Sequence, residues 1–410
     1  MRQIITNFTD TDLYTFSVCL AVLENYPRAH VSYEFFDRNA EVYPKGFADE
    51  LNKQIQAMAT IVPSKEEIAF LKEKCYYFKE WFFEFLSSYR FDPNEVKCWQ
   101  DEEDKLHIKV SGLWYRTIFW EVPLLAMISE MVHMYRRQEG LEPEYDGRRE
   151  YTKSVKRGKK LIENGVVFSE FGTRRRYSLE NHENVLWGLM EANKQYANEK
   201  TGKCVGTSNV YLAYKFKKEF GIDMKIMGTM SHQFPCSIAA MFGPIEANYM
   251  AMYAWAKTYG TDLGIYLYDG LGWKAFESNF SKRFAKDYDG LRVDSGDNYE
   301  MTDRIIAKYK ELGINPLNKT IIFSNALDVD EAIKLHNYCK NKINASMGIG
   351  TKLSCNVEGA KPLNIVIKAT EAKLTEKREM NHVIKISDDL GKHTGDIDTI
   401  NIYKKLLHIS

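Results

Sequence analysis

A histidine and a carboxylate that could carry out phosphoryl chemistry each follow a short apolar run of this sequence. His232 lies four residues beyond Gly228, after the run 224–227, and Asp269 directly follows the run 265–268. A carboxylate can orient an imidazole, and an imidazole so held can act as a base or as a nucleophile towards phosphate. A lone histidine is more often structural, but its place after a predicted strand favours a catalytic role.

Two further carboxylates follow the run 291–293. Asp294 and Asp297 enclose a Ser-Gly pair, which leaves space for a ligand. Such carboxylates can hold ribose hydroxyls or a hydrated magnesium ion. Aspartate and serine are also good helix caps, and the sequence leaves both interpretations open for this motif.

Two other motifs could bind anions. Phe171 stands beside Arg174-Arg175-Arg176, which offers an aromatic face and fixed cations to a flat anionic ring. A solvated charge run is the alternative. Gly348-Ile349-Gly350-Thr351 follows another apolar run, where glycines let backbone amides approach a phosphate. A simple tight turn is about as well supported by that motif alone.

Eight short β-rich runs would position these residues. They are 166–168, 203–205, 224–227, 265–268, 291–293, 321–323, 343–347 and 364–368. Helical patterns fill most of the gaps, at 183–199, 210–220, 238–259, 273–284, 299–312 and 329–342. This alternation predicts an α/β barrel, whose reactive groups lie at the carboxyl ends of its strands. Residues 166–368 are few for a closed barrel, which typically takes ~250, so we expect an irregular or incomplete one.

The residues before the barrel have a different, aromatic-rich α+β pattern. Helices are expected at 10–26 (amphipathic), 47–58, 65–74, 79–85, 123–134 and 147–160, a strand at 31–36, and a hairpin from 96–99 and 106–110. We predict an N-terminal α+β domain (1–150), the barrel with the active site (151–368), and a C-terminal tail (369–410) that packs on the N-terminal domain.

Composition narrows the class of protein. The 56 basic and 56 acidic side chains cancel, which does not favour binding to nucleic acid. The seven cysteines have no C-x-x-C spacing and are expected to be free thiols in a reducing cytoplasm. We see no signal-peptide pattern and no apolar run near the ~20 residues of a membrane span, so no membrane association is expected.

In their order, these motifs resemble those of the nicotinate phosphoribosyltransferase family, a group of type II phosphoribosyltransferases. The resemblance also includes residues 9–14, 120–126, 206–209 and 361–368, and it spans nearly the whole chain. It implies an irregular α/β barrel joined to an α+β domain, usually in a homodimer with sites at the subunit interface. It also implies formation of nicotinate mononucleotide and pyrophosphate from nicotinate and phosphoribosyl pyrophosphate, in NAD biosynthesis, with Mg²⁺ and coupled ATP hydrolysis.

The resemblance assigns roles to the catalytic and phosphate-binding positions. His232 would be transiently phosphorylated, and Asp269 would support it. Asp294 would bind the ribose, and Gly350 with Thr351 would hold the 5′-phosphate.

It assigns the pyridine site in the same way. Tyr14, donated by a partner subunit, and Phe171 would sandwich the ring. Arg174 and Arg292 would meet its carboxylate, with Thr229 nearby.

Two residues depart from the family pattern, and rival functions stay open. Gln233 stands where many members carry a glutamate, which bears on histidine phosphorylation, and Asn325 stands where many carry an aspartate, which bears on one ribose or phosphate contact. Nicotinamide is the nearest alternative substrate, but relatives that prefer it tend to carry an aspartate in the motif at 206–209, where this chain has the neutral Ser208 and Asn209. Quinolinate as the substrate would need a second site for a carboxylate. A sugar-phosphate lyase or aldolase would need a Schiff-base lysine or a metal cluster at the strand ends. Lys225 and Lys368 lie within the β-rich runs, and neither lies in a reactive-looking cluster. A non-enzymatic sensor is the last alternative.

Overall fold

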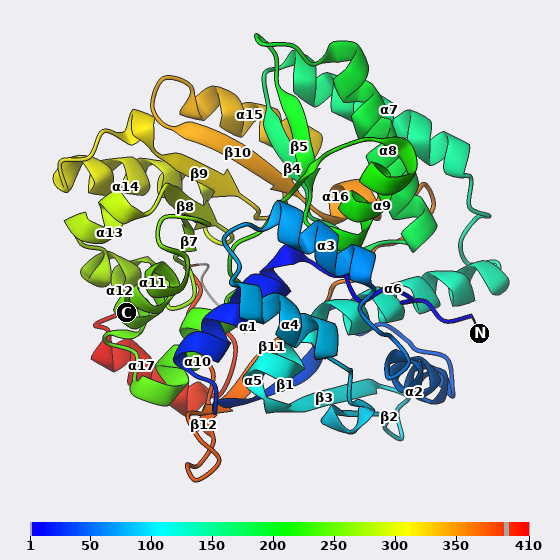
Figure 1. The fold of residues 1–410 in the computed structure, drawn as a ribbon, viewed down its shortest axis with the longest axis horizontal. Coiled ribbons are helices and arrows are strands. Elements are labelled where there is room, and N and C mark those ends of the chain that lie inside the picture. The colour runs from blue at the N-terminus through cyan, green and yellow to red at the C-terminus, as the bar shows by residue number, and fades with distance from the viewer. Residues whose placement is uncertain (1, 389–392, 410) are drawn as a thin grey trace.

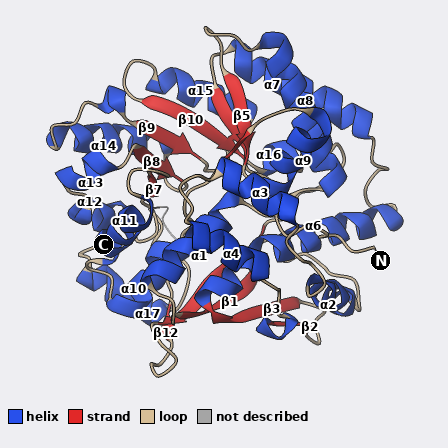
Figure 2. Cartoon of the chain, viewed as in Figure 1, coloured by secondary structure: helices blue, strands red, loops and turns tan. Residues whose placement is uncertain are grey.

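The chain forms two sheets, and helices surround and connect them (Figure 1). The computed structural model describes residues 2–388 and 393–409. Five strands form an antiparallel sheet in the order β12-β11-β1-β3-β2, and seven form a parallel sheet in the order β6-β5-β4-β10-β9-β8-β7. Figure 2 shows the two sheets as separate layers of strands.

The antiparallel sheet contains β1 (His30–Asp37), β2 (Val96–Gln100), β3 (Leu106–Leu113), β11 (Ile365–Lys373) and β12 (Asn381–His382). Around it lie α1 (Leu13–Asn25), α2 (Phe47–Met58), α3 (Lys65–Lys74), α4 (Glu80–Ser88), α5 (Trp114–Thr117) and α6 (Glu121–Gln138). The short helices η1 (Pro93–Glu95) and η2 (Ile118–Trp120) complete this part. The expected hairpin is confirmed, because β2 and β3 pair in antiparallel register.

The parallel sheet contains β4 (Val167–Glu170), β5 (Lys203–Thr207), β6 (Lys225–Ile226), β7 (Ile265–Leu267), β8 (Gly290–Val293), β9 (Thr320–Phe323) and β10 (Asn344–Ile349). Its helices are α7 (Gly147–Glu163), α8 (Leu179–Tyr196), α9 (Val210–Phe220), α10 (Gln233–Phe242), α11 (Ala247–Tyr259), α12 (Gly272–Asn279), α13 (Lys282–Asp287), α14 (Asn298–Glu311), α15 (Val329–Cys339), α16 (Thr351–Ser354) and α17 (Ile397–Leu406), with η3 (Thr173–Arg175) and η4 (Pro316–Asn318). The two edge strands, β6 and β7, do not pair, so the sheet is an open half-barrel, which confirms the expectation of an irregular or incomplete barrel.

The eighth β-rich run does not belong to this sheet, and that prediction is wrong. The run lies in β11, which pairs in antiparallel register with β1 along its whole length. A strand signal is local and does not name its partner, and all eight residues of β1 pair with β11.

Two predicted helices are each split in the structure. The helical pattern at 238–259 becomes α10 and α11, which are separated at Gly243-Pro244. Proline lacks the N–H that a helix interior needs, and it disfavours helical backbone in the residue before it. The pattern at 273–284 is likewise interrupted between α12 and α13.

Helix α1 is buried on all sides rather than amphipathic. Every residue from Leu13 to Val22 is buried. The helix packs between the two halves of the molecule: the backbone N–H of Leu13 donates to the carbonyl of Ser208 at 2.9 Å, and the Cys19 thiol donates to the carbonyl of Tyr115. Its position brings the N-terminal segment to the carboxyl ends of β5 and β6.

The C-terminal tail contacts both halves. Its first part belongs to the antiparallel sheet, through the second half of β11 and through β12. The later part packs on the barrel instead. The Tyr403 hydroxyl donates to the carbonyl of Ala239 in α10 at 2.9 Å, and the backbone N–H of Ile386 donates to the carbonyl of Gly270 at 3.2 Å. We keep the division of the chain near residue 150 as a proposal.

A fully buried ion pair fixes the segment that leads into α1. The Arg176 guanidinium donates to both oxygens of Asp10, at 2.6 and 2.8 Å, and both side chains are inaccessible to solvent. Replacing Arg176 with methionine would leave a buried carboxylate without its counter-charge. We therefore expect a loss of about 3–5 kcal/mol in the free energy of unfolding, measured by chemical denaturation.

The exposed pair of Arg149 and Glu358 provides the control. Arg149→Met should cost at most about 1 kcal/mol, because exposed ion pairs contribute little. Equal losses in the two variants would contradict this account of the buried pair.

Candidate active site

The carboxyl ends of the parallel strands carry almost every predicted site residue. Arg292 lies in β8, and the others follow the end of a strand. They are Phe171 and Arg174 after β4, Ser208 after β5, Thr229 and His232 after β6, Asp269 after β7, Asp294 after β8, and Gly350 with Thr351 after β10. Because parallel strands end at the same edge of their sheet, these residues meet at one place. Tyr14 reaches the same edge from α1.

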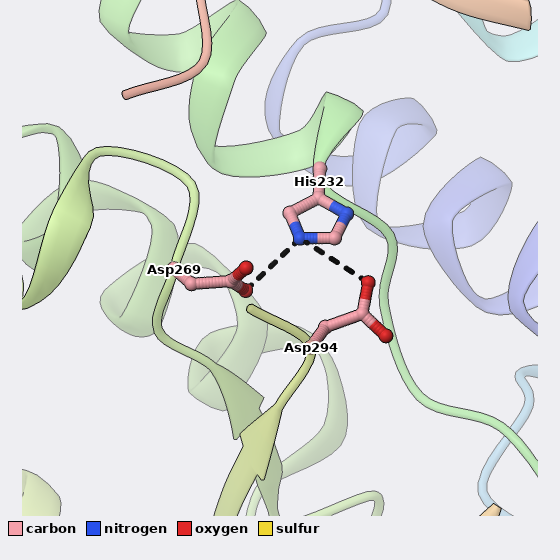
Figure 3. A group of neighbouring side chains, drawn as sticks. All are labelled: His232, Asp269 and Asp294. Carbon is pink, nitrogen blue, oxygen red and sulfur yellow. Dashed lines mark hydrogen bonds and ion pairs between the residues drawn. The ribbon is translucent and has the colours of Figure 1, made fainter. Parts of the chain in front are cut away.

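His232 lies immediately before α10 and faces two carboxylates (Figure 3). Its Nε2 is 2.9 Å from Asp269 Oδ1 and 3.7 Å from Asp294 Oδ2. Asp269 is fully buried, and its Oδ2 accepts a hydrogen bond from the Ser295 hydroxyl at 2.6 Å. A carboxylate only accepts, so the Asp269 contact places the proton on Nε2 and leaves the lone pair on Nδ1. In this tautomer the Lys385 ammonium, 3.0 Å from Nε2, donates to Asp269 and not to the ring. In Figure 3 both dashed contacts end on Nε2, and neither reaches Nδ1.

A lysine from the C-terminal tail completes this group, and the sequence did not reveal it. Lys385 Nζ lies 2.8 Å from Asp269 Oδ2 and 3.0 Å from His232 Nε2. A signal was present, since Lys385 is the one polar residue in the run Val383-Ile384-Lys385-Ile386, whose apolar members are buried. A lysine between buried residues is expected to have a buried partner, and Lys385 is only 17% exposed, but nothing local connects the run to His232.

The charges of this cluster control its protonation. Burial lowers the pKa of His232, and the Lys385 ammonium lowers it further against the opposing effect of Asp269. Burial alone would raise the pKa of Asp269, but His232 and Lys385 outweigh it and hold this pKa well below its usual range. Near neutral pH the site therefore holds a neutral imidazole between a carboxylate and an ammonium group.

Asp294 is the carboxylate best placed to face a substrate. The Ser324 hydroxyl donates to its Oδ1, and Arg292 Nη2 lies 3.4 Å from the same atom. Burial would raise the pKa of Asp294, but Arg292 and His232 outweigh it and lower this pKa. In contrast, the Asp297 carboxylate caps α14 by accepting from the N–H groups of Tyr299 and Glu300. The two interpretations of this motif therefore each apply to one of its carboxylates.

The donor set decides how a divalent cation could bind. Ligand atoms of His232, Asp269 and Asp294 lie within 4.8 Å of one another. However, both oxygens of Asp269 already accept hydrogen bonds, and the Lys385 ammonium stands beside His232. A closed protein cage is therefore not available. The residues fit Mg²⁺ held by Asp294 together with substrate oxygens and water, which is a common arrangement for this ion.

The three arginines of the loop after β4 point in different directions. Arg174 is 41% exposed at its side chain and lies 5.8 Å from the ring centroid of Tyr14 in the same chain. Its guanidinium is 3.7 Å from Asp12 and 3.5 Å from Glu121. Arg175 donates to Asn364, and Arg176 is the buried partner of Asp10. Of the three, only Arg174 lies against Tyr14, and both residues belong to the same chain.

The ring of Phe171 packs directly against the backbone of Gly348. A Cβ atom built on Gly348 would come within 2.5 Å of the Phe171 ring, so the close packing of this ring requires glycine. The backbone N–H of Phe171 donates to the carbonyl of Ile349 at 2.9 Å. These contacts join the aromatic loop after β4 to the Gly350-Thr351 turn at the start of α16.

Ser208 and Thr229 lie at the edge of the same region. The Ser208 hydroxyl donates to Asp12 Oδ1 at 2.7 Å. The carbonyl of Thr229 accepts from the hydroxyl of Ser17 at 2.5 Å, and this contact fixes the loop after β6 against α1.

Several cations face this site, and their charges disfavour one another. Burial, followed by the charges of Arg38 and Lys385, lowers the pKa of Lys368 to about 8. Burial, followed by the charges of Arg174 and Arg38, lowers the pKa of Arg175 to about 10. Cations that destabilise one another in this way are stabilised by a polyanionic ligand.

Both departures from the family pattern have partners in the structure. Gln233 does not face the imidazole of His232, because its side chain is buried against Tyr33, Trp114 and Glu121. Asn325 donates to the carbonyl of Gly296 at 3.1 Å.

Comparison with known proteins agrees with this geometry. The model of the N-terminal domain of the nicotinate phosphoribosyltransferase (NAPRTase) family matches residues 9–129, and the NAPRTase family model matches residues 166–409. The chain belongs to the nicotinate phosphoribosyltransferase family. The nicotinate phosphoribosyltransferases of Desulforapulum autotrophicum and Chromohalobacter salexigens are each 38% identical to it, over 97% and 99% of both chains.

Solved structures agree over the full length. The nicotinate phosphoribosyltransferase of Porphyromonas gingivalis superposes with a TM-score of 0.91 at 37% identity, covering 99% of this chain and 100% of that one. The enzyme of Vibrio cholerae gives a TM-score of 0.87 at 29% identity, covering 100% and 94%. The half-barrel and its antiparallel partner sheet are therefore the fold of this family.

Proposed function

We propose that this member of the family forms nicotinate mononucleotide and pyrophosphate from nicotinate and phosphoribosyl pyrophosphate, with coupled ATP hydrolysis. The observation that carries the proposal is the neutral imidazole of His232, held by Asp269 and Lys385 with Nδ1 free. A nitrogen lone pair fixed in this way can accept a phosphoryl group.

The residues around His232 suit the phosphate-rich substrates. Arg38, Arg175, Lys368 and Lys385 supply positive charge for the phosphates of ATP and phosphoribosyl pyrophosphate. A phosphoryl group on His232 Nδ1 would occupy part of this region. Lys385 would then counter its charge beside Asp269.

Breaking the bond between ribose and pyrophosphate develops positive charge at the anomeric carbon. Asp294 is a charged carboxylate 3.7 Å from His232, and we place the ribose against it. When bound there, Mg²⁺ would neutralise charge on the pyrophosphate leaving group. Gly350 and Thr351 would hold the 5′-phosphate at the opposite end of the ribose, where the chain turns into α16.

The pyridine ring would lie between Tyr14 and Phe171, with its carboxylate towards Arg174 and Arg292. Arg174 already lies over the Tyr14 ring, and a guanidinium binds a carboxylate strongly when two parallel hydrogen bonds form. This arrangement favours the acid over nicotinamide, which carries no charge for the arginine to pair with.

We further propose that Tyr14 serves the pyridine site of its own chain. Tyr14 and Arg174 of the same chain lie together, whereas the resemblance assigns the tyrosine to a partner subunit. The specific activity should stay constant when the enzyme is diluted across its dimer dissociation range, as monitored by sedimentation velocity. A loss of activity in step with dissociation would show that the partner contributes to the site.

The cysteines and the helices bear on the cellular compartment of the protein. All seven cysteines are free thiols, and no helix in the described residues has both the length and the apolar character that a bilayer span needs. We propose a cytoplasmic enzyme.

A product assay tests the proposed function. The enzyme would receive phosphoribosyl pyrophosphate and magnesium with nicotinate, nicotinamide or quinolinate, each with and without ATP. Mononucleotide formed from nicotinate and increased by ATP is the expected result. Product from nicotinamide alone would overturn the assignment of the substrate, and no product from any of the three would overturn the reaction.

Truncating the aromatic side chain of the pyridine site should weaken substrate binding. Phe171→Ala removes a ring expected to stack on nicotinate, a contact that contributes ~1 kcal/mol or more beyond area burial. We expect the KM for nicotinate to rise at least about fivefold while the KM for phosphoribosyl pyrophosphate changes little. An unchanged KM for nicotinate would refute the stacking assignment.

A further inference from the structure

Gln233 occupies a buried network that leads away from the catalytic histidine. Its Oε1 accepts hydrogen bonds from the Tyr33 hydroxyl at 2.5 Å and from Trp114 Nε1 at 3.0 Å, and its Nε2 lies 3.2 Å from Glu121 Oε2. All four side chains are buried. Because a tryptophan N–H can only donate, it fixes the amide oxygen on its own side and turns the amide nitrogen towards Glu121.

The network continues from Glu121 to the pyridine site. Glu121 Oε1 lies 3.5 Å from Arg174 Nη1, so the carboxylate bridges the Gln233 amide and the Arg174 guanidinium. The Arg174 guanidinium in turn lies over the ring of Tyr14. A side chain adjacent to His232 in sequence is thus connected through one carboxylate to the residue proposed to bind the carboxylate of nicotinate.

The amide of Gln233 can donate a hydrogen bond to Glu121, whereas a carboxylate at position 233 could do so only when protonated. A glutamate at 233 would still accept from Tyr33 and Trp114 with one oxygen, but its other oxygen would face Glu121 at about the present distance. Two carboxylates so close share a proton, and the loss of that proton forces them apart. Gln233 instead donates to Glu121 at every pH and leaves it free to carry its charge.

We infer that Gln233 is a positioning residue for nicotinate: its amide holds Glu121 as a charged acceptor that orients Arg174. The inference rests on the proposed function for the identity of the substrate. It also reverses the expected meaning of this departure from the family pattern, which sequence adjacency had linked to phosphorylation of His232.

Gln233→Glu is the decisive variant, with steady-state kinetics measured between about pH 6 and pH 9. The wild-type KM for nicotinate should change little over this range. At the acidic end the variant should have the wild-type KM for nicotinate, because a proton shared between the two carboxylates replaces the N–H of the amide. At the alkaline end, where that proton is lost, its KM should be roughly tenfold higher than that of wild type. The effect should fall on this KM and not on kcat. A variant profile as flat as the wild-type profile would overturn the inference.

The charge swap Glu121→Gln with Gln233→Glu is the matched control. It restores one amide and one carboxylate to the pair, so its KM should again be independent of pH, although Arg174 loses its charged partner and the KM should be raised throughout. A pH-dependent rise that persisted in the swap would contradict the inference. Tyr14, Tyr33, Asp12 and Arg174 are the other titratable groups that face Glu121. They are present in all three proteins, so their contributions cancel.

A measurement without substrate separates this inference from the proposed function. An acid whose pKa is raised by folding binds more protons in the folded state, so its contribution to stability is lost as pH rises. The free energy of unfolding of Gln233→Glu should therefore fall relative to wild type between the acidic and alkaline ends, and that of the charge swap should not. Parallel curves for all three proteins would overturn the inference even if nicotinate proved to be the wrong substrate.

Discussion

Replacing His232 with alanine should abolish the coupling to ATP. The variant should form no phosphoenzyme from γ-labelled ATP, and its rate of mononucleotide formation should be the same with and without ATP. The reason is that Nδ1 of His232 is the nitrogen left free by Asp269, and no other imidazole is brought to this place in the described residues. Slow uncoupled transfer should remain at high substrate concentration, because Asp294 and Arg292 are untouched.

His336→Ala is the control for this experiment. His336 is also half-buried, but it packs against Gly165 behind the sheet. It should keep the full stimulation by ATP. If His232→Ala lost all binding of substrate, the histidine would be structural, and if it still formed a phosphoenzyme, another residue would be the acceptor.

Replacing Lys385 with methionine should slow the ATP-coupled reaction. It should also shift the acidic limb of the pH profile of kcat to higher pH. Removing a preorganised charge at such a site typically costs about a hundredfold in rate. Lys385 also lowers the pKa of His232, since an ammonium group disfavours the imidazolium ion beside it. Without it the imidazole is protonated at a higher pH, so the fall of kcat on acidification should begin at a higher pH than in wild type.

The pH profile distinguishes the two roles of this lysine. In wild type the fall should begin below the usual histidine pKa of about 6.5, because burial and Lys385 both lower the pKa of His232. Lys385→Arg keeps the charge and should keep the acidic limb close to its wild-type position. A methionine variant with an unshifted limb would show that Lys385 does not interact with His232 during turnover.

The sequence predicted most of the half-barrel because its signals are local. The runs that became β4 to β10 alternate with helical patterns, and each is followed by the polar residues that the structure gathers at one edge. The eighth run failed for the same reason: its composition indicates a strand, but its pairing with β1 depends on residues more than three hundred positions away. The spacing of the apolar residues in helix α1 predicts an amphipathic helix, but its polar face is also buried, because the Thr15 and Ser17 hydroxyls donate to backbone carbonyls inside the core.

The site was predicted where strand ends carry the chemistry, and missed where it comes from elsewhere. His232, Asp269 and Asp294 meet as their positions indicated. Lys385 enters from the tail, and only the folded chain brings it to Asp269. Gln233 was linked to His232 by adjacency, but successive residues at the start of a helix point about 100° apart, and its side chain turns into the core.

The positions of Tyr14 and Lys385 in the chain determine when the active site is completed during folding. One residue lies near the start of the chain and the other near its end, and both lie at the same catalytic edge. Contacts between such distant positions carry the largest loop-closure cost in folding and form late. During synthesis, the half-barrel can take shape well before the ribosome reaches residue 385. A newly made molecule therefore passes through a period in which the half-barrel has formed but His232 and Asp269 lack Lys385, so we expect the ATP-coupled reaction to be slow until the tail is in place.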